Sequence, residues 1–191
     1  MNIILASKSP RRLEILRQHG INPMVMPTDT DENLPAGIGM EEAVKMLALE
    51  KARACYKSCR NGVADETDFA GSKIIGSDTI VYTDRILGKP QDRADAWSMI
   101  DSIRGTHHFV CTGVAVIDYD TGAEQVVSDV TRVYVQDMTD AEIDAYLDTD
   151  EPYDKAGAYA IQGIFGQYID HFEGDYENVV GLPYHLLAEM L

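Results

Sequence analysis

The feature that most constrains the fold is an abrupt change from an apolar run to a helix near the start of the chain. Residues 3–6 read Ile-Ile-Leu-Ala, the composition of a buried strand, and a helical pattern begins at Pro10. Ser9 suits an N-cap and Pro10 suits the first helical turn, so the sequence predicts a helix within three residues of the strand's end. We therefore expect a strand-to-helix corner.

Two arginines stand in the first turn of this predicted helix. Arg11 and Arg12 would lie at the positive end of the helix dipole, which is unfavourable for a cation unless an anion lies among them. The free backbone N–H groups of such a corner also suit an anion, so the pattern favours a bound phosphate. The alternative is that both arginines are solvated or paired with acids such as Glu14, because surface arginines are common and cost little.

Composition bounds the class of protein. The chain has 191 residues, 45% apolar and 25% charged, which is enough for one well-buried domain or two lobes that share a core. The formal net charge of −16 argues against a nucleic-acid polymer as partner, whereas a small phosphorylated ligand can still bind a compact cluster of cations. The three cysteines fit reduced thiols better than a disulfide scaffold. We see no membrane span or signal peptide and expect a cytoplasmic protein.

The periodicity predicts one continuous α/β domain. Asp92 is the expected N-cap of one helix, and Thr139 with Glu142 forms the expected capping box of another. A proline at position 183 is expected in the first position of the closing helix. The predicted helices are 10–19, 40–60, 92–104, 139–147 and 183–191, and the predicted strands are 3–6, 24–27, 73–82, 86–90, 106–119, 124–135 and 165–172.

Asp78 is the most informative single residue. It lies in the middle of an otherwise apolar predicted strand, where an unpaired carboxylate would be costly. The functional interpretation is a metal ligand or a base on a rigid element, with Gly76 leaving room for a ligand. The alternative is a structural carboxylate bonded to the backbone or to an arginine.

Three further features are candidates for contact with a ligand. Glu32 follows several acidic and hydroxyl residues in a loop after a strand, a place for a metal ligand or base, although a plain polar turn also fits. Lys51 lies at the edge of the apolar face of the helix 40–60, where it could reach a ligand or simply cover apolar surface with its stem. Residues 153–163 are rich in small residues that allow a ligand close to the backbone, and Asp154, Lys155 and Gln162 could contact it.

A pair of histidines, His107 and His108, lies on a predicted strand. Adjacent strand residues face opposite ways, so the two rings cannot easily share a metal ion. We therefore do not expect a metal site there.

Together these segments resemble the Maf family of nucleoside triphosphate pyrophosphatases. They occur in the family's order from one end of the chain to the other, which makes the match specific. Lys8 is a minor departure, since small residues are frequent at that position of the family's turn. The matching segments are residues 5–12, Glu32, 50–52, 76–79, 88–90, 112–114, 154–157, 161–163 and 180–183.

The resemblance implies both a fold and a reaction. The implied fold is α/β and related to the inosine-triphosphate pyrophosphatases, with an elongated mixed sheet flanked by helices and a nucleotide cleft between two lobes. The whole chain, residues 1–191, would form this single domain. The implied enzyme is a hydrolase of phosphoric anhydrides that uses a divalent cation, Mg²⁺ or Mn²⁺, to convert a nucleoside triphosphate and water into the monophosphate and pyrophosphate.

The resemblance also implies roles for individual residues. Asp78 resembles the family's proton acceptor and Glu32 an acidic partner near the metal, which both carboxylates would bind. A triphosphate carries about four negative charges, so several cations must neutralise it before a hydroxide-like nucleophile approaches phosphorus. The residues that resemble the phosphate-binding set are Ser7, Arg11, Arg12, Lys51 and Lys89.

Substrate preference within the family is implied by Arg11, Thr79 and Gln162. Thr79 and Gln162 resemble the subgroup that acts on dTTP and UTP, whereas the 7-methyl-GTP subgroup looks different at both positions. The chemistry is consistent, because a glutamine amide offers one donor and one acceptor to the O4 and N3–H edge of uracil or thymine. We therefore expect dTTP, UTP and modified pyrimidine nucleotides as preferred substrates.

Two other classes of protein compete with this interpretation. A nucleotide-binding regulator without turnover would keep the arginines and lose the carboxylates, but Glu32 and Asp78 are both present. A phosphomonoesterase would need a covalent nucleophile or a two-metal cluster, and neither is visible. The expected partner is the nucleotide alone, with no nucleic-acid polymer and no membrane, and a homodimer is common among relatives.

Overall fold

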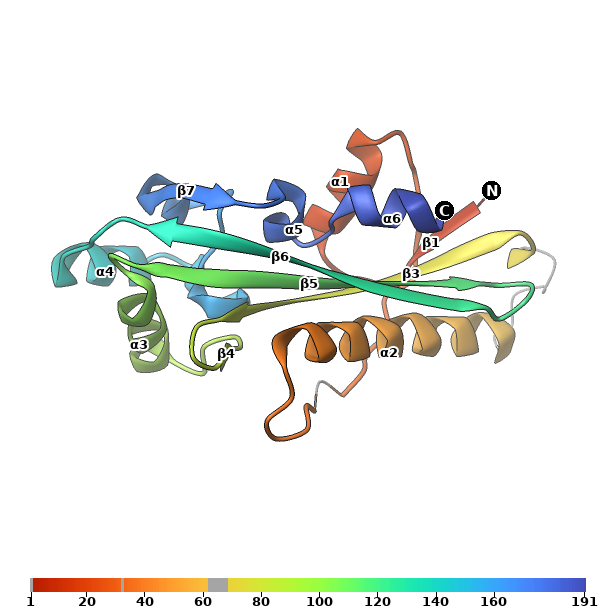
Figure 1. The fold of residues 1–191 in the computed structure, drawn as a ribbon, viewed down its shortest axis with the longest axis horizontal. Helices are drawn as coiled ribbons and strands as arrows, with labels where there is room; N and C mark the ends of the chain where they lie inside the picture. The colour runs from red at the N-terminus through yellow and green to blue at the C-terminus, as the bar shows by residue number, and fades with distance from the viewer. Residues whose placement is uncertain (1, 32, 62–68) are drawn as a thin grey trace. The chain divides into compact units, whose positions relative to one another are not determined.

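The computed structural model of the protein describes residues 2–31, 33–61 and 69–191. Helices and strands follow one another as expected of an α/β chain (Figure 1). In chain order they are β1 Asn2–Leu5, α1 Pro10–Gln18, β2 Met24–Val25, α2 Met40–Asn61, β3 Ser72–Tyr82, β4 Ile86–Leu87, α3 Arg93–Ile103, β5 His107–Asp118, β6 Glu124–Val135, α4 Asp140–Leu147, the 3-10 helices η2 Pro152–Asp154, η3 Ala156–Ala158 and η4 Ile164–Tyr168, then β7 Ile169–Glu173, α5 Tyr176–Val180 and α6 Tyr184–Met190.

The strands within the described residues form a mixed sheet of seven strands in the order β2-β1-β3-β5-β6-β7, with β4 paired to β3. β1 lies between β2 and β3 and is parallel to both. β4 is antiparallel to β3, and β7 is antiparallel to β6. A mixed sheet flanked by helices confirms the predicted fold class.

The chain divides into two compact units. Unit 1 comprises Met1–Asp78, Thr112–Asp129 and Gly181–Leu191, and unit 2 comprises Thr79–Cys111 and Val130–Val180. The long strands β3, β5 and β6 therefore contribute residues to both units.

Unit 1 has helices on both faces of its strands. α2 runs along one face, and α1 and α6 lie on the other (Figure 1). The rings of His19 at the end of α1 and Tyr184 at the start of α6 stack with centroids 3.6 Å apart. Its buried cluster, formed by β1, α2, β3 and the β5–β6 hairpin, is Ile4, Ala6, Ala48, Ala52, Cys55, Cys59, Phe69, Ile74, Ala115, Ile117 and Tyr119.

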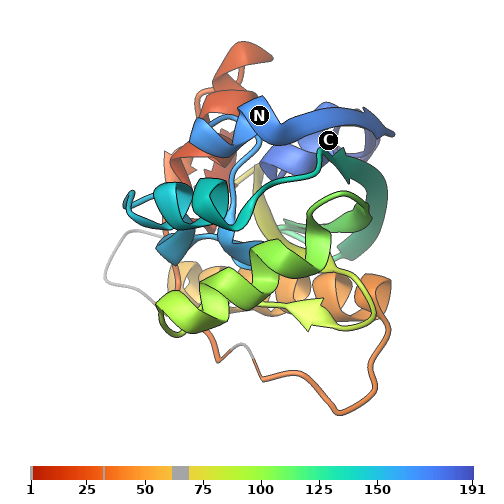
Figure 2. The same cartoon turned by 90° about the vertical axis from the view of Figure 1, so that its left-hand side faces the viewer.

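Unit 2 contains α3 and α4, which lie side by side (Figure 2). Arg104 follows α3 and donates to the Met138 carbonyl at 3.0 Å, and it pairs with Asp140 of α4 at 2.6 Å. The core of this unit is centred on the fully buried Phe165. Its ring packs against Tyr146 and Tyr159 with centroid separations of 5.1 and 4.9 Å.

The capping preferences of single residues correctly predicted where two helices, α3 and α4, begin. Asp92 accepts a hydrogen bond from the Asp95 N–H at 2.8 Å, which confirms the N-cap of α3. Thr139 and Glu142 form the reciprocal bonds of a capping box, as predicted for α4. Ser9 also occupies the N-cap position of α1, but its side chain makes no capping hydrogen bond.

Four predicted boundaries were wrong. The strand expected at 86–90 spans only Ile86–Leu87. Residues 164–168 form a 3-10 helix and the strand begins only at Ile169, because the first N–H groups of that helix bind the Glu151 carboxylate. The helix at the C-terminal end begins at Tyr184, and Pro183 is its N-cap with non-helical backbone angles (φ −70°, ψ 88°). The strand expected at 24–27 spans Met24–Val25, and Pro27 has no N–H to extend the ladder.

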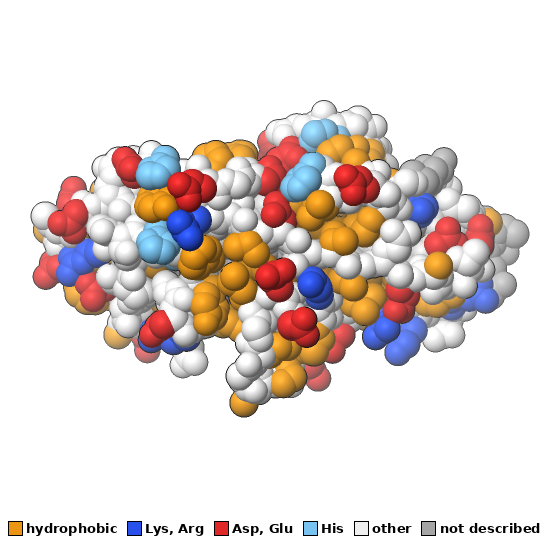
Figure 3. Space-filling model, viewed as in Figure 1, with side chains coloured by type: hydrophobic (Ala, Val, Ile, Leu, Met, Phe, Trp, Pro, Cys, Tyr) orange, Lys and Arg blue, Asp and Glu red, His pale blue; other side chains and the backbone are white. Residues whose placement is uncertain are grey.

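The burial of the cysteines and the charged side chains on the surface are consistent with the composition. Cys55, Cys59 and Cys111 are buried and form no disulfide with one another, as expected of reduced thiols, and burial raises the pKa of Cys55 to about 12. Acidic and basic side chains are scattered over the face seen in Figure 3. Among the described residues, every helix is too short or too polar to cross a membrane.

Candidate active site

The site is built on a close contact between α2 and β3. A Cβ atom added to Gly76 would lie 2.2 Å from the carbonyl oxygen of Ala48 and 2.7 Å from the backbone nitrogen of Ala52. Gly113 of β5 makes the same kind of contact, with its added Cβ 2.3 Å from the Val44 carbonyl oxygen. Any side chain at Gly76 would meet the helix backbone. The prediction that Gly76 leaves room for a ligand was therefore wrong: it leaves room for α2.

Asp78 faces the same helix because it is two residues beyond Gly76 on the strand. Lys51 belongs to the turn of α2 that crosses Gly76, and its Nζ pairs with Asp78 Oδ1. The two side chains are only 14% and 11% exposed, so this ion pair is shielded from solvent. The costly strand carboxylate thus has a lysine partner rather than the arginine or backbone partner considered as the alternative.

The strand-to-helix corner is held by a second network. Ser7 is 7% exposed, and its Oγ accepts hydrogen bonds from the Ser9 N–H at 3.2 Å and from Arg12 Nη1 at 3.1 Å. Arg12 Nε donates to the Gly181 carbonyl oxygen at 2.8 Å, and Ser77 Oγ donates to the same oxygen at 3.1 Å. Gly181 has a φ of 122°, a conformation that favours glycine. One carbonyl therefore ties Arg12 to the strand that carries Asp78.

The two arginines of the strand-to-helix corner differ in their hydrogen bonding. Arg12 is bound as described, whereas Arg11 is half-buried and makes no hydrogen bond or ion pair with another residue in the described ranges. Nearby, the exposed Lys8 pairs with Asp29 at 2.6 Å, and this hydrogen bond lowers the pKa of that carboxyl. Glu32 lies outside the described residues, so its predicted role stays a prediction.

The remaining predicted site residues belong to unit 2. Thr79 follows Asp78 directly on β3 and is half-buried. Lys89 is exposed just after β4. Gln162 is exposed in a turn closed by a hydrogen bond from the Gly163 N–H to the Ala160 carbonyl at 3.2 Å. Within unit 1, then, the structure brings together Ser7, Arg12, Lys51 and Asp78 through the two networks on β3.

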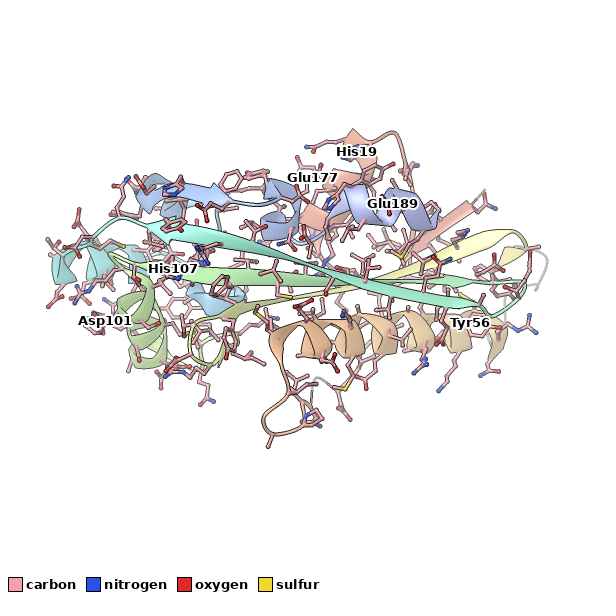
Figure 4. All side chains as sticks on the ribbon, viewed as in Figure 1. His19, Tyr56, Asp101, His107, Glu177 and Glu189 are labelled. Carbon is pink, nitrogen blue, oxygen red and sulfur yellow. The ribbon has the colours of Figure 1, made fainter. Side chains whose placement is uncertain are left out.

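The adjacent histidines face opposite ways, as predicted. His107, labelled in Figure 4 at the start of β5, is exposed, whereas His108 is fully buried. His108 Nε2 lies 2.6 Å from the Tyr159 hydroxyl. Burial, reinforced by the neighbouring His107, lowers the pKa of His108 to about 3, so this imidazole is neutral in the folded protein at ordinary pH.

Comparison with known proteins identifies the family. A sequence profile described as "Maf-like protein" matches residues 2–191. The chain belongs to the Maf family.

Curated members of the Maf family are similar over nearly all of this chain. A protein of Alkaliphilus oremlandii named dTTP/UTP pyrophosphatase is 43% identical over 189 residues, which cover 99% of this chain and 94% of the relative. The protein of the same name from Syntrophotalea carbinolica is 44% identical and covers 99% and 83%, respectively. A solved structure, that of the Staphylococcus aureus Ham1 protein, covers 88% of this chain and 91% of its own with a TM-score of 0.46 and 13% identity.

Two hydrogen-bonding groups of this Maf site, the Ser77 hydroxyl and the Gly181 carbonyl, were not predicted from the sequence. Ser77 gave a usable signal, because a buried hydroxyl between Gly76 and Asp78 needs a hydrogen-bond partner. The Gly181 carbonyl gave none, because a backbone oxygen has no residue-type signature and lies 169 residues from Arg12 along the chain.

Proposed function

We propose that this Maf protein hydrolyses dTTP and UTP to the nucleoside monophosphate and pyrophosphate. The observation that carries the proposal is the shielded Lys51–Asp78 pair on the rigid contact between α2 and β3. Asp78 of this pair directly follows Ser77, and Ser77 and Arg12 both donate to the Gly181 carbonyl oxygen. A carboxylate, a lysine and an arginine held on a fixed framework suit the hydrolysis of an anionic phosphoric anhydride. The names of the relatives support the same reaction.

In the proposed reaction, Asp78 accepts a proton from a water molecule that attacks the α-phosphorus. A bond forms between the water oxygen and this phosphorus, and the bond from the α-phosphorus to the oxygen bridging to the β-phosphorus breaks, which releases pyrophosphate. Lys51 stands beside the carboxylate and would offset negative charge that develops on the phosphoryl oxygens. Asp78 is suited to the role because its strand holds it in one place.

The phosphate-binding set would neutralise the rest of the triphosphate. We assign this task to Arg11, Arg12 and Lys89 with the hydroxyl of Ser7. Arg12 is preorganised by Ser7 and the Gly181 carbonyl, so binding would cost little side-chain ordering. Arg11 and Lys89 are the less restrained cations of the set. Pyrophosphate bound by these cations is a stabilised leaving group.

A divalent cation fits the residues that are present. Asp78 offers hard carboxylate oxygens on a rigid strand, and Mg²⁺ commonly binds one or two carboxylates together with substrate phosphates. We assign Asp78 and Glu32 as its protein ligands. A bound Mg²⁺ or Mn²⁺ would neutralise charge and polarise the phosphoryl oxygens.

Base preference is assigned to Gln162 with Thr79 and Arg11. The exposed amide of Gln162 can pair with the O4 and N3–H edge of thymine or uracil. Cytosine presents an amino group and a bare N3 on that edge, so a site committed to uracil would leave polar groups unpaired with CTP. Modified pyrimidine nucleotides that keep this edge, such as 5-methyl-UTP, would be accepted.

A nucleotide panel tests the proposal. The protein is incubated with Mg²⁺ or Mn²⁺ and each of dTTP, UTP, CTP, ATP, GTP and 7-methyl-GTP, and the products are identified. We expect monophosphate and pyrophosphate, with kcat/KM for dTTP and UTP at least ~10-fold above the others. Diphosphate and phosphate as products would contradict the reaction, and a preference for GTP or 7-methyl-GTP would contradict the base assignment alone.

Three further expectations are part of the same proposal. Residues 1–191 form one functional domain, the protein acts in the cytoplasm, and a homodimer is the oligomeric state to test. Light scattering coupled to size-exclusion chromatography tests the last of these.

A further inference from the structure

The turn that presents Gln162 is fixed at both ends by buried aromatic residues. Before it, Tyr159 is 6% exposed, and after it, Phe165 is fully buried. Their ring centroids are 4.9 Å apart. The segment between them, in which residues 162–164 are exposed, therefore leaves the core of unit 2 and returns to it at neighbouring points.

Glu151 binds the end of this turn. Its Oε2 accepts a hydrogen bond from the Ile164 N–H at 2.6 Å, and its Oε1 accepts one from the Phe165 N–H at 3.1 Å. These N–H groups belong to the first residues of η4, where no earlier carbonyl of the same helix can accept them. The carboxylate therefore satisfies two backbone donors that directly follow the segment carrying Gln162, in charge-assisted bonds.

Gly163 shows how closely Glu151 packs there. A Cβ atom added to Gly163 would lie 2.1 Å from Glu151 Oε2. The residue that follows Gln162 must therefore be glycine for the carboxylate to reach the backbone. A side chain at position 163 would displace the Glu151 carboxylate from the Ile164 and Phe165 N–H groups.

Tyr146 connects Glu151 to the other side of the turn. Its hydroxyl lies 3.2 Å from Glu151 Oε1 and 3.0 Å from the carbonyl oxygen of Ala158, and its single proton can be donated to either. Burial and the adjacent Glu151 carboxylate raise the pKa of Tyr146. The hydroxyl thus stays protonated and lies between the carboxylate and the backbone that precedes the turn, donating to one of them at a time.

We propose that Glu151, supported by Tyr146, is a positioning residue for substrate specificity: it fixes the backbone of the turn so that the Gln162 amide is presented in one orientation. The inference rests on the proposed role of Gln162. Base discrimination by an amide requires its donor and acceptor to be placed correctly, and a mobile turn would let the amide adapt to cytosine as well. Glu151 acts through Gln162 and does not itself contact the nucleotide.

The test replaces Glu151 with glutamine, which keeps the shape and removes one acceptor oxygen. The readout is the ratio of kcat/KM for dTTP to that for CTP, and we expect the ratio to fall at least about fivefold. Asp150→Asn is the matched control, because it removes the same charge from the preceding, exposed residue and should leave the ratio unchanged. Tyr146→Phe removes only the linking hydroxyl and should lower the ratio in the same direction.

A double-mutant comparison separates positioning from general destabilisation. If Glu151 acts through Gln162, the change Glu151→Gln should have no further effect on the ratio in a Gln162→Ala background. Hydrogen exchange of the Ile164 and Phe165 amides should also be faster in Glu151→Gln than in Asp150→Asn.

The outcomes are distinct. A selective wild-type enzyme whose Glu151→Gln variant keeps the dTTP/CTP ratio overturns the inference, even if the variant melts at a lower temperature. An equal fall in the ratio with and without Gln162 overturns it too. A wild-type enzyme with no preference for dTTP over CTP would refute the proposed base assignment and the inference together.

Discussion

Replacing Gly76 with alanine tests whether the contact between α2 and β3 sets the geometry of the site. The new methyl group would lie 2.2 Å from the Ala48 carbonyl oxygen, whereas ordinary contacts begin at 3.4 Å. The obstacle is helix backbone and cannot rotate away. The helix must therefore move from the strand by about 1 Å, because a close-packed interior has no free space to absorb the methyl group.

The size of the effect follows from which residues move. Lys51 travels with α2 while Asp78 stays on β3, so their ion pair is stretched or reoriented. A displacement of about 1 Å in a catalytic group can cost ~10²-fold in rate. Overpacking of this kind also lowers the free energy of unfolding by about 1–3 kcal/mol. We expect Gly76→Ala to fold, with kcat/KM for dTTP reduced about 10²-fold.

The assay pairs steady-state kinetics with urea unfolding. Gly39→Ala, just before α2, is the control, because an added Cβ there meets no atom within 4 Å and its φ is not positive. This variant should keep wild-type kinetics and stability. A folded Gly76→Ala protein with wild-type kcat/KM would refute the reasoning that this contact positions Lys51 against Asp78.

Three further predictions test individual groups. Asp78→Asn should reduce kcat for dTTP ~10²-fold or more while thermal melts still show a folded protein, and near-normal turnover would remove Asp78 from the mechanism. Arg12→Ala should raise KM and lower Tm, since Arg12 also binds the Gly181 carbonyl, whereas Arg11→Ala should raise KM alone; equal melting shifts would contradict this division. His108 takes up a proton near pH 6.5 in the unfolded chain but only near pH 3 in the folded protein. The free energy of unfolding should therefore decline as the pH falls from 6.5 to 3, by about 1.4 kcal/mol per pH unit. His108→Gln should flatten the dependence of unfolding free energy on pH, His107→Gln should not, and an unchanged slope in the first variant would count against a neutral buried imidazole.

Local chemistry explains what could be predicted from the sequence. The corner after β1, the caps at Asp92 and Thr139, and the unusual strand carboxylate at Asp78 all depend on residues close together in the chain. Such features follow from backbone and burial rules that apply before tertiary contacts form.

What could not be predicted depends on long-range contacts. Gly76 was expected to make room for a ligand, but which neighbour occupies the space beside a glycine is decided only when α2 packs on the sheet. The strand expected at 165–172 begins only at Ile169, and the Phe165 N–H donates instead to Glu151, an acid 14 residues upstream. The residue list of the site was therefore easier to predict than the backbone atoms that hold it.

The turn that carries Gln162 and the two residues that support it, Tyr146 and Glu151, have an evolutionary consequence. Tyr146, Glu151 and Gln162 all lie within residues 146–165, while the lysine and carboxylate proposed to act on phosphate lie in other segments, at positions 51 and 78. A lineage could therefore change base preference by exchanging this segment together with Thr79 and Arg11, while inheriting Lys51 and Asp78 unchanged. Grafting residues 146–165 from a relative with another preference, with the relative's residues at positions 79 and 11, would recreate such a step.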